Sequence, residues 1–300
     1  MRALARRYLP LSAQSLLRRL YYHSPALRRL YHAPQRLKDR WHRRDGPRRP
    51  PVGLSQVGNG DFEEIGKEFL GYFTTLGGLT PDDAVLDVGS GVGRMAIALT
   101  SYLSERARYE GFDVVPDGIR WCQQHLTPRY PRFQFQIADV RNQLYNPKGA
   151  ASAAEYHFPF DDGTFDFCLG TSIFTHLLPE EVAHYLAEIA RVLRPGGRCL
   201  ATFFLVEDEA LTGGESTTLQ RFHGRYRGHL VTDERIPEAS IAYRETAVRR
   251  YFDESGFDVM EPFHYGSWSG RKEFLSWQDI VVGRKRSQSY SYAPNRSVAV

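Results

Sequence analysis

The 300-residue sequence contains only three cysteines, Cys122, Cys168 and Cys199, and they form no C-x-x-C pair. Zinc sites use paired cysteine spacing, whereas isolated cysteines are typical of reduced thiols in a cytosolic protein. The sequence therefore predicts no metal site and three small, buried thiol side chains.

The sequence also lacks an apolar run long enough to cross a membrane. Its longest apolar run, from Cys199 to Val206, has the length of a buried strand. With 42% hydrophobic and 13% aromatic residues, the chain can still bury a complete core of helices and strands. We therefore expect a cytoplasmic protein with an α/β core.

Acidic residues are scarce in residues 1–50, which hold 14 Lys and Arg against only Asp39 and Asp45. This segment thus has a net charge of +12, and the rest of the chain is net negative because the total is only +4. The sequence Leu-Arg-Arg-Leu-Tyr occurs twice, at residues 17–21 and 27–31. Leucine and tyrosine among arginines are compatible with an amphipathic helix on anionic lipid, a nucleic-acid arm, an organellar transit peptide or a solvated basic arm.

A proline-rich stretch, residues 46–51, predicts a linker after this basic segment. We therefore expect three parts: residues 1–57 as a basic N-terminal arm and linker, residues 58–286 as the folded domain, and residues 287–300 as a disordered tail. Lipid binding by the arm would place the protein at the inner face of a membrane.

The stretch Ala84–Met95 has three glycines at alternate positions, Gly89, Gly91 and Gly93, directly after a short apolar run that includes Asp87. Apolar residues then recur at helical spacing. Glycines let the backbone reverse sharply and approach a ligand, while the first turn of a helix offers unpaired N–H groups. The stretch therefore predicts a strand, a ligand-binding glycine turn and a helix that runs to Tyr102.

Two other glycine motifs fit this stretch less well. Arg94 stands where the dinucleotide fingerprint G-x-G-x-x-G needs its third glycine, and no Gly-Lys-Ser/Thr follows, so a dehydrogenase and a P-loop protein are disfavoured. The pattern D-x-G-x-G-x-G at residues 87–93 instead resembles the first motif of the class I S-adenosylmethionine-dependent methyltransferases. A turn that only packs a helix on a strand is the structural alternative.

A second region has the same resemblance, through F-P-F-x-x-x-x-F-D at residues 158–166 and R-V-L-R-P-G-G at residues 191–197. The shorter stretches Y-N-P-x-G, F-T-H-L and G-S-W-S-G are similar to bacterial methyltransferases of undefined substrate. The resemblance covers about residues 58–286. It implies an α/β, Rossmann-like methyltransferase fold: a mostly parallel seven-stranded sheet with helices on both faces and an antiparallel last strand.

Hydrophobic periodicity and turn residues predict the other elements. Helices are expected from residue 62 to the glycines at 77–78, beside the ligand pocket, and at 179–194 and 238–255. The loops 141–160 and 207–237 are long enough for an active-site flap and a substrate lid. Strands are expected at residues 109–113, 133–137, 165–169, 198–205, 259–264 and 278–282.

The resemblance implies S-adenosylmethionine as the cofactor. Asp113 lies 20 residues after Gly93, where an acid can accept hydrogen bonds from a ribose. An acid after the third strand faces the adenine amino group in this family, which implies that role for Asp139. Arg94 either orders the glycine turn or contacts the methionine carboxylate. The implied cofactor-binding residues are Asp87, Gly89, Ser90, Gly91, Gly93, Arg94, Asp113, Val114, Asp139, Val140, Thr171 and Ser172.

The implied reaction is in-line attack of a nucleophile on a sulfonium methyl group, for which the protein supplies positioning. An oxygen nucleophile usually has to lose its proton. His176 is the candidate base, because histidine titrates near neutral pH; a packing or capping histidine is the alternative. Candidate substrate contacts are Tyr145, His157, Arg221, Tyr226 and Trp268.

The absence of two motifs narrows the class of methyl acceptor. The fourth strand is followed neither by Asp/Asn/Ser-Pro-Pro-Tyr/Phe nor by Pro-Cys, which disfavours adenine or glutamine amino groups and cytosine C5. We expect transfer to an oxygen or nitrogen of a small-molecule, glycan or lipid-linked acceptor. The alternatives are an RNA methyltransferase that uses the basic arm, whose RNA binding would depend steeply on salt, and a non-catalytic S-adenosylmethionine-binding protein.

Overall fold

The computed structural model describes residues 60–207 and 224–287 without a break, together with residues 16, 20, 24, 27, 30, 33, 49–51, 54 and 222. Most of the predicted basic arm, part of the predicted 207–237 lid and nearly all of the predicted tail lie outside the described residues. Among the helices described, none is both long and apolar enough to cross a membrane.

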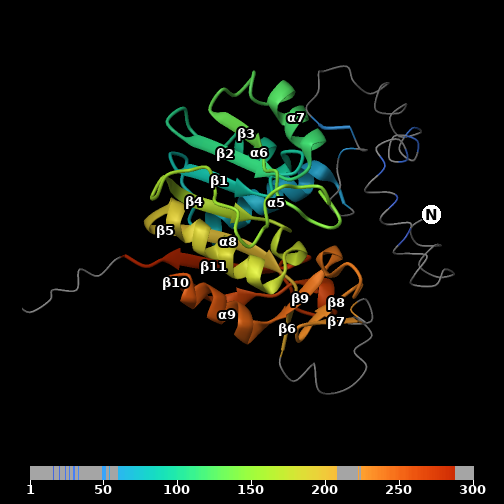
Figure 1. Cartoon of the computed structure of the whole chain (residues 1–300). Coiled ribbons are helices and arrows are strands. Elements are labelled where there is room, and N and C mark those ends of the chain that lie inside the picture. The colour runs from blue at the N-terminus through green and yellow to red at the C-terminus, as the bar shows by residue number, and fades with distance from the viewer. Residues whose placement is uncertain are drawn as a thin grey trace, which may run out of the picture.

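The centre of the molecule is a seven-stranded sheet (Figure 1). Its strands are β1 (Ala84–Val88), β2 (Arg108–Asp113), β3 (Phe133–Ile137), β4 (Phe165–Gly170), β5 (Leu193–Phe203), β10 (Phe257–His264) and β11 (Asp279–Lys285). They stand in the order β10-β11-β5-β4-β1-β2-β3, and only β11 runs antiparallel to its neighbours. The predicted fold, with its antiparallel last strand, is confirmed.

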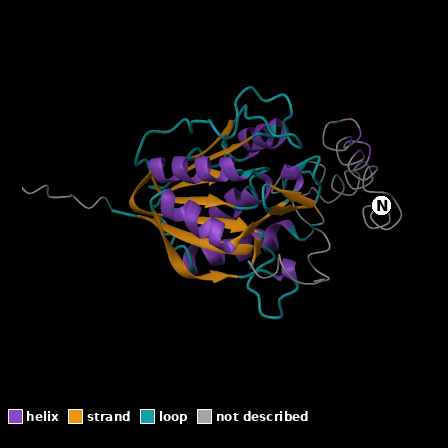
Figure 2. Cartoon of the chain, turned by 60° about the horizontal axis from the view of Figure 1, so that its bottom comes forward, coloured by secondary structure: helices purple, strands orange, loops and turns teal. Residues whose placement is uncertain are grey.

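Helices cover both faces of this sheet (Figure 2). They are α5 (Phe62–Thr75), α6 (Arg94–Leu99), α7 (Pro116–His125), α8 (Pro179–Val192) and α9 (Glu245–Glu254). Alternate strand residues point to opposite faces, so Leu86 packs with α8 and α9, while Val85 packs with α5, α6 and α7. The three cysteine side chains are buried in these two cores, as predicted.

A second, smaller sheet lies beside the central one, in the order β6-β9-β8-β7 (Figure 1). It consists of β6 (Leu205–Val206), β7 (Gly224–Tyr226), β8 (His229–Val231) and β9 (Ile241–Arg244), with the 3-10 helix η4 (Pro237–Ala239) before β9. The prediction of one helix over 238–255 is therefore wrong for its first half. Ile241, Ala242 and Tyr243 are fully buried where β9 pairs with β8, and this pairing outweighs the local pattern.

Two other predicted boundaries shift. β5 begins at Leu193 rather than at residue 198, because Phe165 of β4 already pairs with Leu193 ahead of the Pro-Gly-Gly turn residues. The helix after the glycine turn ends at Leu99 and does not reach Tyr102. Neither change moves the carboxyl ends of β1, β2 and β4, where the predicted site lies.

Candidate active site

The glycine turn joins β1 to α6 and is anchored on the neighbouring strand β2. The N–H groups of Gly89 and Ser90 donate to the Phe112 carbonyl at 2.9 and 3.0 Å. Gly91 has a φ of 57°, in the left-handed region that favours glycine. Apart from Gly91 itself and its two neighbours in the chain, no described residue has an atom within 4 Å of the position that a Cβ on Gly91 would take. The turn therefore presents bare backbone to an open space that a ligand can occupy.

The carboxylate of Asp113, at the end of β2, holds this turn in place. Its Oδ2 accepts the Gly91 N–H at 2.9 Å, and its Oδ1 accepts the Val115 N–H at 2.8 Å. Burial raises the pKa of Asp113, and the two backbone donors oppose that rise. The structure thus brings the predicted ribose-binding acid and the glycine turn together.

A cavity of about 590 Å³ lies at these strand ends and is also lined by α5. This volume falls within the roughly 300–1,000 Å³ of small-molecule sites. Ser90 lines the cavity, and its buried Oγ has no hydrogen-bond partner within the described part of the chain. The predicted cofactor residues that line the cavity are Gly89, Ser90, Gly91, Arg94, Asp113, Val114, Val140, Thr171 and Ser172.

The other three predicted cofactor residues, Asp87, Gly93 and Asp139, do not line the cavity. Asp87 is buried behind the turn, where its Oδ2 accepts the Tyr109 hydroxyl at 2.5 Å. Gly93 precedes α6 and packs against Cys122. Asp139 is exposed, and its Oδ1 lies 3.4 Å from the Asn146 amide nitrogen. The geometry therefore gives no support to a direct cofactor contact by these residues.

Ser172, after β4, adopts an unusual backbone conformation with a φ of 61°. Its N–H donates to the Thr202 Oγ1 at 2.7 Å, and its Oγ donates to the Gln278 Oε1 at 2.8 Å. Such strain is found where a ligand site over-determines the backbone. Gln278 also lines the cavity. Gln278 could not be identified from the sequence, because it lies 106 residues from Ser172 and no local motif marks it.

The cavity is also lined by His176 and Tyr145. His176 ends the 3-10 helix η1 (Phe174–His176), and its Nδ1 lies 2.9 Å from the backbone carbonyl of Glu238 in η4. Because a carbonyl only accepts, the neutral ring carries its proton on Nδ1 and keeps Nε2 as an acceptor. This Nε2 lies 3.4 Å from the Tyr145 hydroxyl. The candidate base and one candidate substrate contact are thus neighbours.

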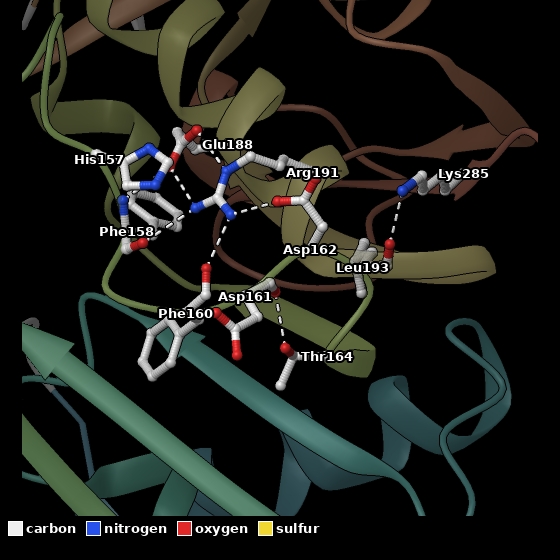
Figure 3. Close-up of polar contacts among 10 residues, drawn as sticks. All are labelled: His157, Phe158, Phe160, Asp161, Asp162, Thr164, Glu188, Arg191, Leu193 and Lys285. Atoms are coloured by element: carbon white, nitrogen blue, oxygen red, sulfur yellow. Dashed lines mark hydrogen bonds and ion pairs between the residues drawn. The ribbon is translucent and has the colours of Figure 1, made fainter.

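His157, another candidate substrate contact, does not line the cavity, and its ring lies beside Glu188 (Figure 3). Its side chain is 70% exposed, with Nδ1 3.2 Å from the Glu188 Oε2. Figure 3 also shows Arg191 donating to the carbonyls of Phe158 and Phe160, at 3.0 and 2.8 Å. Arg191, the first residue of the motif at 191–197, thus binds the backbone of the motif at 158–166.

Two further candidate substrate contacts, Tyr226 and Trp268, do not line the cavity either. Tyr226 lies on β7 under the Arg227 guanidinium, 5.4 Å from the ring centre. Trp268 is buried, and its Nε1 donates to the Asp279 carboxylate at 2.6 Å. Arg221 lies outside the described residues. Over the described ranges, no group of three or more His, Cys, Asp or Glu residues is arranged to hold a metal ion.

Comparison with known proteins identifies relatives over part of the chain. Residues 85–197 match the family described as "Methyltransferase domain". A phthiotriol/phenolphthiotriol dimycocerosates methyltransferase of Mycobacterium leprae is 34% identical over 113 residues, 38% of this chain and 34% of that protein. An uncharacterized protein of Haemophilus influenzae is 25% identical over 166 residues, 55% of this chain and 58% of that protein. The alignments thus span less than two thirds of either relative.

A solved structure from Pyrococcus horikoshii shares the fold, with a TM-score of 0.52 and 16% identity, over 78% of this chain and 95% of that chain. The strand order, the glycine turn and the cavity at the strand ends define a Rossmann-like, cofactor-binding α/β protein. With the family match, they show that residues 85–197 belong to a methyltransferase domain of the class I type, whose cofactor is S-adenosylmethionine.

Proposed function

We propose that the protein transfers a methyl group from S-adenosylmethionine to an oxygen or nitrogen of a small-molecule, glycan or lipid-linked acceptor. The observation that supports this most directly is one cavity lined both by the glycine turn with Asp113 and by His176 with Tyr145. A shared space for cofactor and acceptor is what direct group transfer needs. A lipid-linked acceptor is favoured by the Mycobacterium leprae relative, which is named for phthiotriol and phenolphthiotriol dimycocerosates.

We assign the cofactor contacts to the nine predicted residues that line the cavity. When bound, S-adenosylmethionine supplies an electrophilic methyl group on its sulfonium sulfur. Asp113 is placed to accept hydrogen bonds from hydroxyl groups, and the bare backbone at Gly91 allows close approach. Asp87 and Gly93 shape the turn from behind.

His176 is our proposed base for a hydroxyl acceptor. The Glu238 carbonyl accepts the Nδ1–H, which fixes the ring orientation and leaves the Nε2 lone pair as the proton acceptor. The acceptor oxygen would lose its proton to this nitrogen as it attacks, and Tyr145 at 3.4 Å would help to position it. The cavity wall supplies positioning.

For residues 1–50 we propose peripheral contact with the inner face of a membrane. The segment has 14 basic and two acidic residues. Among its described residues, Leu16 and Leu30 are helical and expose 58% and 73% of their surface. Exposed leucines in a segment whose sequence is rich in arginine are typical of segments that lie in a headgroup layer.

Titration calorimetry with S-adenosylhomocysteine tests the cofactor site. We expect the wild type to bind and Asp113→Ala to bind at least about tenfold more weakly, because hydrogen bonds to a charged group contribute about 1.5–3 kcal/mol each. Asp139→Ala is the matched control: it removes an exposed aspartate that does not line the cavity, so its affinity should equal that of the wild type.

A folded wild type without affinity would contradict the cofactor site, and a loss confined to Asp139→Ala would contradict our assignment of the residues. Transfer of labelled methyl groups to separated aqueous and lipid extracts would then test the acceptor. A protein that binds the cofactor but labels neither extract would contradict the proposed transfer and favour the non-catalytic alternative.

A further inference from the structure

Three exposed apolar side chains lie beside the cavity, between η5 (Ser267–Ser269) and β11. Phe274, Leu275 and Trp277 expose 58%, 40% and 51% of their surface, and we call them the apolar rim. Trp277 and the buried Ser276 also line the cavity, so the rim is continuous with the cavity wall. Clustered exposed apolar side chains at a site mark a surface that binds another molecule.

Backbone hydrogen bonds hold the rim in this position. The Leu275 N–H donates to the Tyr265 carbonyl at 3.0 Å, and the Leu275 carbonyl accepts the Tyr72 hydroxyl of α5 at 2.7 Å. The carbonyls of Ser276 and Trp277 accept N–H groups of η5 at 2.9 and 3.1 Å. The segment is therefore fixed at both edges, and its exposed side chains are part of a defined surface.

The charged residues around the rim add little net charge, so the rim would bind a partner through its apolar side chains. Lys272 and Glu273 are both exposed and offset each other in charge, and Arg271 pairs with Glu207 at 2.8 Å. Phenylalanine, leucine and tryptophan next to a lysine are typical of a headgroup boundary, where rings and aliphatic groups enter and the charged group stays in water. Electrostatic attraction would come instead from the basic segment 1–50.

We infer that the apolar rim inserts into the surface of a lipid membrane, so that the cavity opens onto the headgroup layer. The protein would then attach at two points, the basic arm and the rim. This inference rests on the proposed function, since a lipid-linked acceptor could enter the cavity from the bilayer without leaving its apolar surroundings. Beyond the proposed function, the inference specifies which part of the domain faces the membrane.

Cosedimentation of the full chain with vesicles of phosphatidylcholine and phosphatidylglycerol tests the inference. The double variant Phe274→Ser/Leu275→Ser should bind about tenfold more weakly, because two partly inserted apolar side chains are lost. The matched control Ile137→Ser/Met260→Ser removes side chains of 42% and 40% exposure that do not line the cavity, and should bind like the wild type. Equal loss in both double variants, no loss in the rim variant, or no binding by the wild type would overturn it.

A second measurement separates insertion from disturbance of the site. The three native cysteines are buried, so an environment-sensitive dye can be placed on Phe274→Cys, with Ile137→Cys as the control. Vesicles should shift the emission to the blue only for Phe274→Cys, and equal emission with and without vesicles would overturn the inference. Titration of the same proteins with S-adenosylhomocysteine reports on the cofactor site separately, so failure of the proposed function is distinguished from failure of the rim.

Discussion

Asp87 is a buried acid behind the glycine turn, with 1% of its surface exposed. Its Oδ2 accepts the Tyr109 hydroxyl, and its Oδ1 has no hydrogen-bond partner among the described residues. Burial raises the pKa of Asp87 to about 7; the charge of Asp113 adds to the rise, and the Tyr109 hydrogen bond opposes it. The native state therefore favours the protonated form at mildly acidic pH.

Replacement of Asp87 by asparagine should change how stability depends on pH. The folded pKa lies above the unfolded value of about 3.9, so the stabilising contribution of this group is complete below pH ~4 and is lost as the pH rises through about 7. Between those limits, the free energy of unfolding of the wild type should fall by up to about 4 kcal/mol relative to Asp87→Asn. Urea unfolding at a series of pH values measures this, and parallel curves for the two proteins would contradict it.

At the scale of elements, one carboxylate joins β11, β6 and η5. Asp279 accepts the N–H groups of Gly266 and Leu205 and the Nε1–H of Trp268, each at 2.6 Å. Burial raises the pKa of Asp279 to about 6, and these donors oppose the rise. The tryptophan that the sequence suggested as a substrate contact thus stabilises the junction between the two sheets.

Trp268→Phe keeps an aromatic ring at this junction but removes its donor. We expect the free energy of unfolding to fall by about 2 kcal/mol, since a hydrogen bond to a charged group is lost. Affinity for S-adenosylhomocysteine should not change, because Trp268 does not line the cavity. Trp277→Phe is the stability control. Its ring is 51% exposed, so the substitution should change the free energy of unfolding by less than about 0.5 kcal/mol. A large loss of cofactor affinity in Trp268→Phe would contradict the structural role.

The strands of the central sheet could be predicted because their buried side chains recur at every second residue. Phe133 and Phe135 alternate with glutamines along β3, and both are buried. The small sheet could not be predicted, because its strands contain only two to four residues and depend on pairing with one another. The pairing of β9 with β8 and β6 directs Ile241 and Tyr243 into the core cluster that also contains Phe203.

Those parts of the site whose residues are close together in the sequence could be predicted. The spacing from Gly93 to Asp113 predicted an acid that accepts hydrogen bonds from a ribose, and the hydrogen bond from Gly91 to Asp113 joins this acid to the glycine turn. Glu68 and Gln278 line the same cavity but belong to other segments of the chain. Hydrophobic periodicity does not reveal which separate segments the fold brings together. His157 looked suitable by residue type alone, but its chain position directs it to Glu188.

Across the whole molecule, the small sheet reaches the cavity through residues far along the chain. The Glu238 carbonyl contacts His176, and the Tyr243 hydroxyl of β9 donates to the Leu177 carbonyl at 2.5 Å. The Glu238 Oε1 also accepts the Gln143 N–H at 3.0 Å, on the segment that contains Tyr145. The insertion between β5 and α9 therefore positions both the candidate base and its neighbour.

This arrangement predicts one tautomer for His176, with the proton on Nδ1 when the ring is neutral. Long-range ¹H–¹⁵N spectra of the full chain can test it, with the signal assigned through His176→Gln. Two other histidines serve as internal standards: His125 has its Nδ1, and His184 its Nε2, 2.9 Å from a backbone carbonyl. His176 should resemble His125 and differ from His184. A ring protonated on Nε2 would have no lone pair facing the acceptor, and the proposed proton transfer would then be wrong.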